Sequence, residues 1–156
     1  MTYSAYAVAN AFVQRAQEGR LEGLSSMKLQ KLMYFAHAWH LKVRQTPLVT
    51  DIFIRWTHGP LIPCIQSQYQ AYGNRPVLQT VRTLSGDSER EHWRTPVIPD
   101  WDDDAWGLVD AIIDRYGKFS ARALSDLTHE PDSAWSRGEP NGSVIPNDMI
   151  RVDPTI

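Results

Sequence analysis

The chain has 156 residues and an apolar share of 42%, which suffices for one domain with a buried core, expected over residues 1–156. Its net charge of −2 excludes the strongly basic character of a dedicated duplex-DNA binder, and its one cysteine, Cys64, excludes an internal disulfide framework. No apolar run approaches the roughly 20 residues that span a bilayer, and the first residues do not resemble a signal peptide. We therefore expect a cytoplasmic protein without membrane contact.

Two helices open the predicted fold. Apolar residues at helical spacing predict an amphipathic helix over residues 4–18, with Ser4 as its cap. Ser25 or Ser26 then caps a second helix, over residues 26–44. That second helix is apolar on most sides, so we expect it to be central, with other elements packed around it.

Residues 50–57 alternate in polarity and predict a β-strand. One face is more apolar and is expected to point inward, whereas the other face is expected to point outward or towards a second layer. The inward set is Ile52, Ile54 and Trp56, and the outward set is Asp51, Phe53 and Arg55. Trp39, Trp56 and Tyr69 are expected in the core.

The sequence His58-Gly59-Pro60 predicts a turn in which Gly59 supplies positive φ and Pro60 fixes the next φ. Pro63 suits the first turn of a third helix, over residues 63–72. Residues 77–84 are compatible with a second strand that pairs with the first.

The remaining elements are helical. Residues 102–104 lead into a fourth helix that Gly117 ends, and Ser120 caps a short fifth helix. Turns of helix are expected around residues 132–135 and 147–150. The predicted fold is mainly α (α+β): a compact bundle of five to seven helices around the central helix, with one small antiparallel β-sheet.

Several residue groups could carry chemistry. His37 and His40 lie three apart on the central helix and could share a metal with His58 or Cys64, but core histidines are the more common outcome. Asp102, Asp103 and Asp104 could hold a cation, although acids at a helix N-terminus are the plainer interpretation. No nucleophile–base pair or glycine-rich phosphate loop is evident, so we expect neither an enzyme nor a cofactor.

Residues 119–135 begin like a helix-turn-helix motif. The segment that would read DNA, Glu130-Pro131-Asp132-Ser133-Ala134-Trp135, is acidic and contains proline. Such a segment is unsuited to a DNA groove lined by phosphates, so direct DNA binding is not expected, and we interpret residues 119–135 as a packing segment anchored by Trp135.

Short signatures recur in a fixed order along residues 25–73. They are Lys28-Leu29-Gln30-Lys31-Leu32, Ala38-Trp39-His40, the strand from Asp51 to Trp56, and His58-Gly59-Pro60 followed by Pro63. Leu124-Ser125-Asp126-Leu127-Thr128-His129 and Trp135 follow later. The chain thereby resembles the Panacea antitoxin domain family, whose SocA-like and GepA-like members occur in bacteria and phages. Residues 77–100 carry none of these signatures.

The resemblance implies an antitoxin that binds and neutralises a toxin encoded beside it. It also leaves open a role as an adaptor that hands the toxin to an ATP-dependent protease. Two alternatives remain: a hydrolase or nucleic-acid-acting enzyme that uses His37, His40 and His58 or the Asp102–Asp104 cluster, and a phage- or secretion-associated structural adaptor.

For toxin binding we expect a surface with an apolar centre and a basic rim, because aromatic and arginine side chains dominate interface energetics. The expected residues are Lys28, Lys31, Phe53 and Arg55. A second set, expected to serve the fold, comprises Trp39, Trp56, Gly59 and Pro60.

Overall fold

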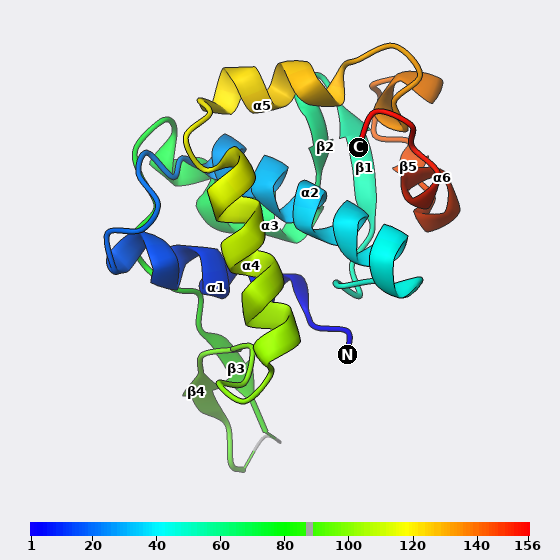
Figure 1. The fold of residues 1–156 in the computed structure, drawn as a ribbon. Coiled ribbons are helices and arrows are strands. Elements are labelled where there is room, and N and C mark those ends of the chain that lie inside the picture. Colours follow the sequence, from blue (N-terminus) through cyan, green and yellow to red (C-terminus); the bar gives the residue numbers. More distant parts are fainter. Residues whose placement is uncertain (87–88) are drawn as a thin grey trace.

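The computed structural model describes residues 1–86 and 89–156, and it is an α+β structure in which helices predominate (Figure 1). The α-helices are α1 Ala5–Gln17, α2 Ser26–Arg44, α3 Pro63–Tyr69, α4 Asp103–Tyr116, α5 Ala121–Thr128 and α6 Asn147–Arg151. Short 3-10 helices follow at Gln70–Tyr72 and Trp135–Arg137. The strands are β1 Phe53–Trp56, β2 Gly59–Leu61, β3 Thr83–Ser85, β4 His92–Arg94 and β5 Val144–Ile145. The predicted fold class is confirmed.

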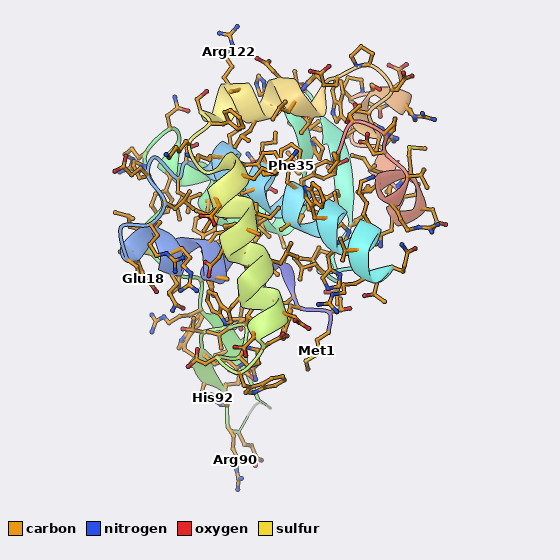
Figure 2. All side chains as sticks on the ribbon, viewed as in Figure 1. Met1, Glu18, Phe35, Arg90, His92 and Arg122 are labelled. Atoms are coloured by element: carbon orange, nitrogen blue, oxygen red, sulfur yellow. The ribbon has the colours of Figure 1, made fainter. Side chains whose placement is uncertain are left out.

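Helix α2 is the centre of the fold, as predicted. It contacts α1, α4, α5 and α6, which surround it in Figure 1. Every residue from Lys28 to Ala38 is buried, because neighbours cover this helix on all sides. Ser25 caps the helix by accepting a hydrogen bond from the Lys28 amide, and Gln45 ends it in the left-handed conformation. Figure 2 shows Phe35 of this helix in the middle of the molecule.

Local capping signals set the starts of three other helices. Ser4 accepts a hydrogen bond from the Ala7 amide at α1, and Ser120 accepts one from Ala123 at α5. Asp102 accepts one from Ala105 at α4, which confirms the plainer interpretation of the acidic cluster. These bonds join residues three apart, so the sequence alone is enough to predict them.

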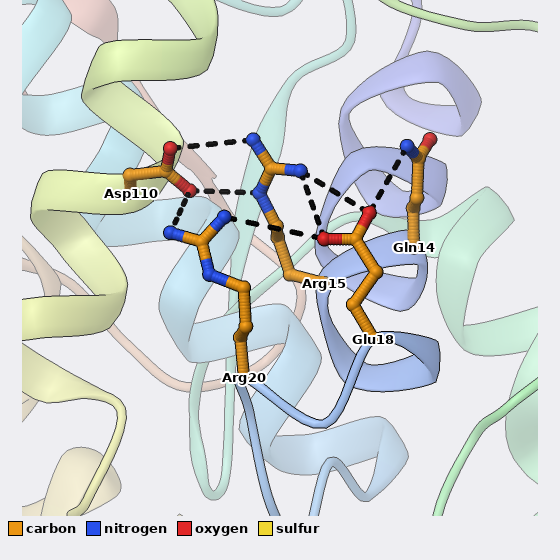
Figure 3. A network of polar contacts seen from close by, with 5 residues as sticks. All are labelled: Gln14, Arg15, Glu18, Arg20 and Asp110. Carbon is orange, nitrogen blue, oxygen red and sulfur yellow. Dashed lines mark hydrogen bonds and ion pairs between the residues drawn. The ribbon is translucent and has the colours of Figure 1, made fainter.

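An ionic network joins α1 to α4 (Figure 3). The Arg15 guanidinium lies 2.8 Å from the Asp110 carboxylate of α4 and 3.1 Å from Glu18 of its own helix. Arg20 reaches the same Asp110 at 3.3 Å. Because α1 and α4 both pack on α2, this network links two of the helices that enclose it.

The main sheet is antiparallel, with the strand order β2-β1-β5. Strand β1 pairs Ile54 with Leu61 on one side and with Val144 on the other. The predicted pairing of residues 77–84 with β1 is wrong, because β5, from near the end of the chain, occupies that edge. Residues 83–85 pair instead with β4 in a separate hairpin, which extends away from the helices (Figure 1) and carries Arg90 and His92 at its far end (Figure 2).

The segment before the hairpin is anchored by a buried asparagine. The Asn10 carboxamide accepts a hydrogen bond from the Val81 amide at 2.7 Å and donates to the carbonyls of Val81 and Pro96, at 3.0 and 2.8 Å. Val77 and Val81 are buried against the core. The backbone amide and carbonyl of Val81 are therefore paired by a side chain, whereas the Val77 amide donates to the Leu24 carbonyl.

Candidate functional site

The face of strand β1 that is exposed to solvent is the one that was expected to point inward. Phe53 and Arg55 are buried, with 1% and 4% of their surface exposed. Ile52 and Trp56 are 55% and 48% exposed, and Ile54 between them is half-buried. The expected inward set is therefore the outer set, and the expectation that Trp56 belongs to the core is wrong.

The inward position of Arg55 has a clear physical cause. Its guanidinium donates to the carbonyls of Ala134, Trp135 and Val144 at 2.8–3.0 Å, and to the Ser143 hydroxyl at 3.2 Å. Hydrogen bonds from a charged donor are stronger than neutral ones, and four of them offset the loss of water around the charge. Arg55 thus ties β1 to the C-terminal part of the chain.

Phe53 packs into an aromatic cluster on the inner side of β1. Its ring meets the Tyr34 ring edge-on at a centroid distance of 5.2 Å and lies 5.3 Å from the His37 ring. Both partners come from α2. Helix α2 therefore covers Phe53 and separates it from solvent.

The two lysines of the expected basic rim are buried as well, at 5% exposure for Lys28 and 2% for Lys31. The Lys28 ammonium donates to the carbonyls of Glu22 and Gly117, whereas Lys31 donates to the Pro60 carbonyl at 3.2 Å. Burial lowers the pKa of Lys28, and it lowers the pKa of Lys31 to about 7. The expectation of an exposed surface made of Lys28, Lys31, Phe53 and Arg55 is therefore wrong.

The residues expected to serve the fold occupy different environments. Gly59 has φ +116°, as the turn signature predicts, and Pro60 is buried beside it. A Cβ at Gly59 would meet the Thr128 hydroxyl at 2.6 Å, so only glycine fits. Trp39 is half-buried, and its indole N–H donates to the Tyr116 hydroxyl at 3.2 Å.

The histidines of the catalytic alternative lie in separate environments. His37 is fully buried: its Nδ1 accepts from the Val49 amide at 3.3 Å, and its Nε2 donates to Asn147 at 2.9 Å. The His40 ring bonds the Thr46 carbonyl, and His58 is exposed on the β1–β2 turn. Across residues 1–86 and 89–156, no group of three or more His, Cys, Asp or Glu side chains could hold a metal ion.

Two acids of the Asp102–Asp104 cluster have structural partners. The Tyr3 hydroxyl donates to Asp102, and Asp104 forms an ion pair with Arg44 at 3.1 Å. Burial and the nearby Asp51 carboxylate raise the pKa of the Cys64 thiol. A raised pKa disfavours the thiolate, which is the reactive form of cysteine.

We expect His37 to make the protein sensitive to acid. Burial lowers the His37 pKa from 6.5 to about 4, so the unfolded chain takes up a proton between these pH values and the folded chain does not. The contribution of His37 to the free energy of unfolding is therefore fully present above pH 6.5 and is lost as the pH falls towards 4. This loss amounts to about 3 kcal/mol. Urea unfolding of the wild type and of His37→Gln across this range checks it. A wild-type curve parallel to that of the variant would contradict the assignment.

The exposed side of the sheet offers a different surface, which we call the outer sheet face and define as Ile52, Ile54, Trp56 and Val144. Ile54 and Val144 are register partners, and Trp56 lies two residues after Ile54 on the same side of β1. Ile52 lies two residues before Ile54, directly ahead of the strand, and extends this apolar strip. Val144 is 45% exposed. The buried Phe53 and Arg55 hold the strip rigid from behind. The alternation of polar and apolar residues over 50–57 predicts this strand, but it does not predict which face of the strand is exposed.

Among the described residues, no helix is long and apolar enough to cross a membrane.

Comparison with known proteins relates this architecture to one family. The family model described as "Antitoxin SocA-like, Panacea domain" matches residues 29–136. The chain is also similar to antitoxin SocA of Caulobacter vibrioides (strain NA1000 / CB15N), with 30% identity over 136 residues, covering 84% of this chain and 68% of that protein. No solved structure matches the chain. The matched span runs from α2 to the 3-10 helix at Trp135, and so includes most of the central helix and most of the outer sheet face.

Proposed function

The chain belongs to the Panacea-domain family of SocA-like antitoxins, and from this premise we propose that it neutralises a cognate toxin by binding it directly, without catalysing a reaction. The observation that carries the direct-binding part is the outer sheet face. An exposed tryptophan flanked by aliphatic side chains on a rigid strand is the kind of anchor that dominates protein–protein interfaces.

The outer sheet face suits this role better than the hairpin, which also exposes Trp93 and Leu84, at 61% and 51%. A two-stranded hairpin has little stability of its own, so binding would have to order it. Strand β1, by contrast, is paired on both edges and packed against α2 from behind. A preorganised strip loses less conformational entropy on binding and therefore retains more of its contact energy as affinity.

Neutralisation of this kind needs only that the toxin's active site or substrate path be covered. A standard interface buries about 800 Å² on each partner. The outer sheet face would form the apolar centre of such an interface, with polar residues around it at the rim. No catalytic group is required on the antitoxin.

Co-expression tests the proposal. We expect the product of the adjacent gene to stop growth when it is expressed alone, and growth to return when the chain is expressed with it. An empty vector provides the control. A neighbour that is harmless by itself would remove the basis of the antitoxin assignment.

The abundance of the toxin in the rescued cells separates two modes of action. Steric neutralisation, which we propose, leaves the toxin at an undiminished level in a complex with the chain. If the chain were instead an adaptor for an ATP-dependent protease, the toxin's half-life would shorten, and rescue would fail in cells that lack that protease. A protease-dependent rescue would contradict the steric mode.

A further inference from the structure

A pocket of about 210 Å³ lies at the N-terminal end of α2. Its walls come from the first turns of α2, from the β1–β2 turn and from the region where α3 continues into the 3-10 helix. Its polar lining includes Ser26, Gln30, Lys31, His58, Gln66 and Gln70.

Lys31 is the only buried cation of this lining within the described part of the chain, and its hydrogen bonding is incomplete. An ammonium group has three N–H donors. Lys28 and Lys42 each donate to two backbone carbonyls, whereas the one described acceptor of Lys31 is the Pro60 carbonyl at 3.2 Å. No described carboxylate lies within ion-pair distance of it.

Ser26, on the same pocket wall, is a second buried group without a partner. The residue is 7% exposed, and its hydroxyl has no hydrogen-bond partner in the described structure. It occupies the first position of α2, a helix of 19 residues. The amides of Ser26 and Met27 precede the first intrahelical bond, and the helix dipole adds positive potential at this end. Ser25 satisfies the next amide, that of Lys28.

Gly59 leaves the space that the Lys31 side chain occupies. A Cβ at this position would lie 2.8 Å from the Lys31 Cε atom and 3.4 Å from its Nζ atom. The glycine of the turn therefore leaves room for the end of the lysine side chain at the pocket wall. Gly59 is therefore needed both for the β1–β2 turn and for the position of Lys31 in the pocket.

We propose that this pocket binds a carboxylate group, held by the Lys31 ammonium, the Ser26 hydroxyl and the first amides of α2. Unpaired buried donors and a helix N-terminus that meet in one small cavity are a binding site for an anion. One buried ammonium matches the single charge of a carboxylate. The second charge of a phosphate would find no second buried cation there, because Lys28 is bonded to Glu22 and Gly117.

Binding is coupled to the protonation of Lys31. Burial holds the pKa of this lysine at about 7, and a bound carboxylate raises it, so binding takes up a proton above that pH. The neighbouring elements bring two titratable side chains to this region, His58 on the β1–β2 turn and His129 beside Thr128 on α5. Lys28 is the nearby charged residue of α2 itself.

Amide chemical shifts, followed while sodium acetate is added near pH 6, test the site, since Lys31 is protonated there. We expect saturable shifts at Ser26, Met27 and Gly59 with acetate and none with sodium chloride at equal ionic strength. Lys31→Met removes the charge and keeps the length of the side chain, and should weaken acetate binding at least tenfold. Lys118→Met, at an exposed lysine, is the matched control and should bind as the wild type does.

Two further ligands identify the source of the carboxylate. N-acetylglycine resembles the end of a peptide chain, so its tighter binding points to a chain terminus, whereas tighter binding of acetate points to a small free acid. Either result supports the site. Equal affinities of the wild type and Lys31→Met for acetate would overturn it, as would tighter binding of inorganic phosphate than of acetate. Ser26→Ala provides a second variant, expected to bind acetate more weakly with an unchanged fold.

Discussion

Arg55→Met should lower the free energy of unfolding by about 4 kcal/mol, one of the largest effects expected of any single substitution in this chain. The variant removes a guanidinium that bonds the carbonyls of Ala134, Trp135 and Val144. Leaving buried polar groups unpaired costs about 1–3 kcal/mol each, and methionine can supply no hydrogen to them. Because folded proteins are stable by only about 5–15 kcal/mol in total, such a loss would bring the variant close to unfolding.

Urea unfolding of the variant and of Arg122→Met measures the difference. Arg122 is exposed on α5 and points away from the body of the protein (Figure 2), so the same chemical change there should cost less than about 0.5 kcal/mol. If the two variants were equally stable, Arg55 would not connect β1 to the C-terminal segment as the hydrogen bonds indicate.

The second large effect concerns binding rather than folding. Replacing Ile52 by Ser and Trp56 by Ala together should weaken toxin binding by more than about 2 kcal/mol, or roughly thirtyfold in Kd. Both side chains are about half exposed, so their loss should leave the thermal midpoint close to that of the wild type. A measurement of toxin affinity checks the expected loss of binding, and thermal unfolding of the same preparation checks that the fold is unchanged.

A matched control comes from the hairpin. Leu84→Ser with Trp93→Ala makes the same kinds of change at equally exposed positions of β3 and β4, and should bind the toxin normally. The reverse pattern, with the hairpin variant impaired and the β1 variant intact, would move the binding site to the hairpin.

The sequence predicts those parts of this fold that depend on nearby residues. Ser4, Ser25, Ser120 and Asp102 each bond an amide three residues on, so helix starts are readable from a few letters. The central position of α2 also follows from composition, because a helix that is apolar all round needs neighbours on every side.

The orientation of β1 depends instead on distant partners. Both faces of residues 52–56 carry large apolar side chains, and the presence of arginine on one face makes that face look external. Arg55 is internal because carbonyls about 80 residues away accept its hydrogens, and the sequence between them does not reveal that proximity. The edge of β1 is taken by β5 for the same reason, although residues 77–84 are closer along the chain.

The candidate sites also combine residues that the sequence reveals with contacts between distant residues that it does not reveal. The motif residues Lys31 and Gly59 are visible in the sequence, but their meeting in one pocket depends on how α2 packs against the β1–β2 turn. Lysines near a helix start are usually solvated, so a buried and incompletely bonded one could not be predicted from its position alone. The apolar side chains of the strip on β1 are likewise visible in the sequence, but the side of the sheet on which they lie is not.

The most direct test of the central claim is a binding measurement between the purified chain and the purified product of the adjacent gene. We predict a stable complex with a Kd below about 1 μM, corresponding to roughly 8 kcal/mol, in which the toxin is inactive and the chain's Ile52 and Trp56 are required. If the wild-type chain formed no complex with a toxin whose effect it nevertheless suppresses in cells, neutralisation by direct contact would be contradicted.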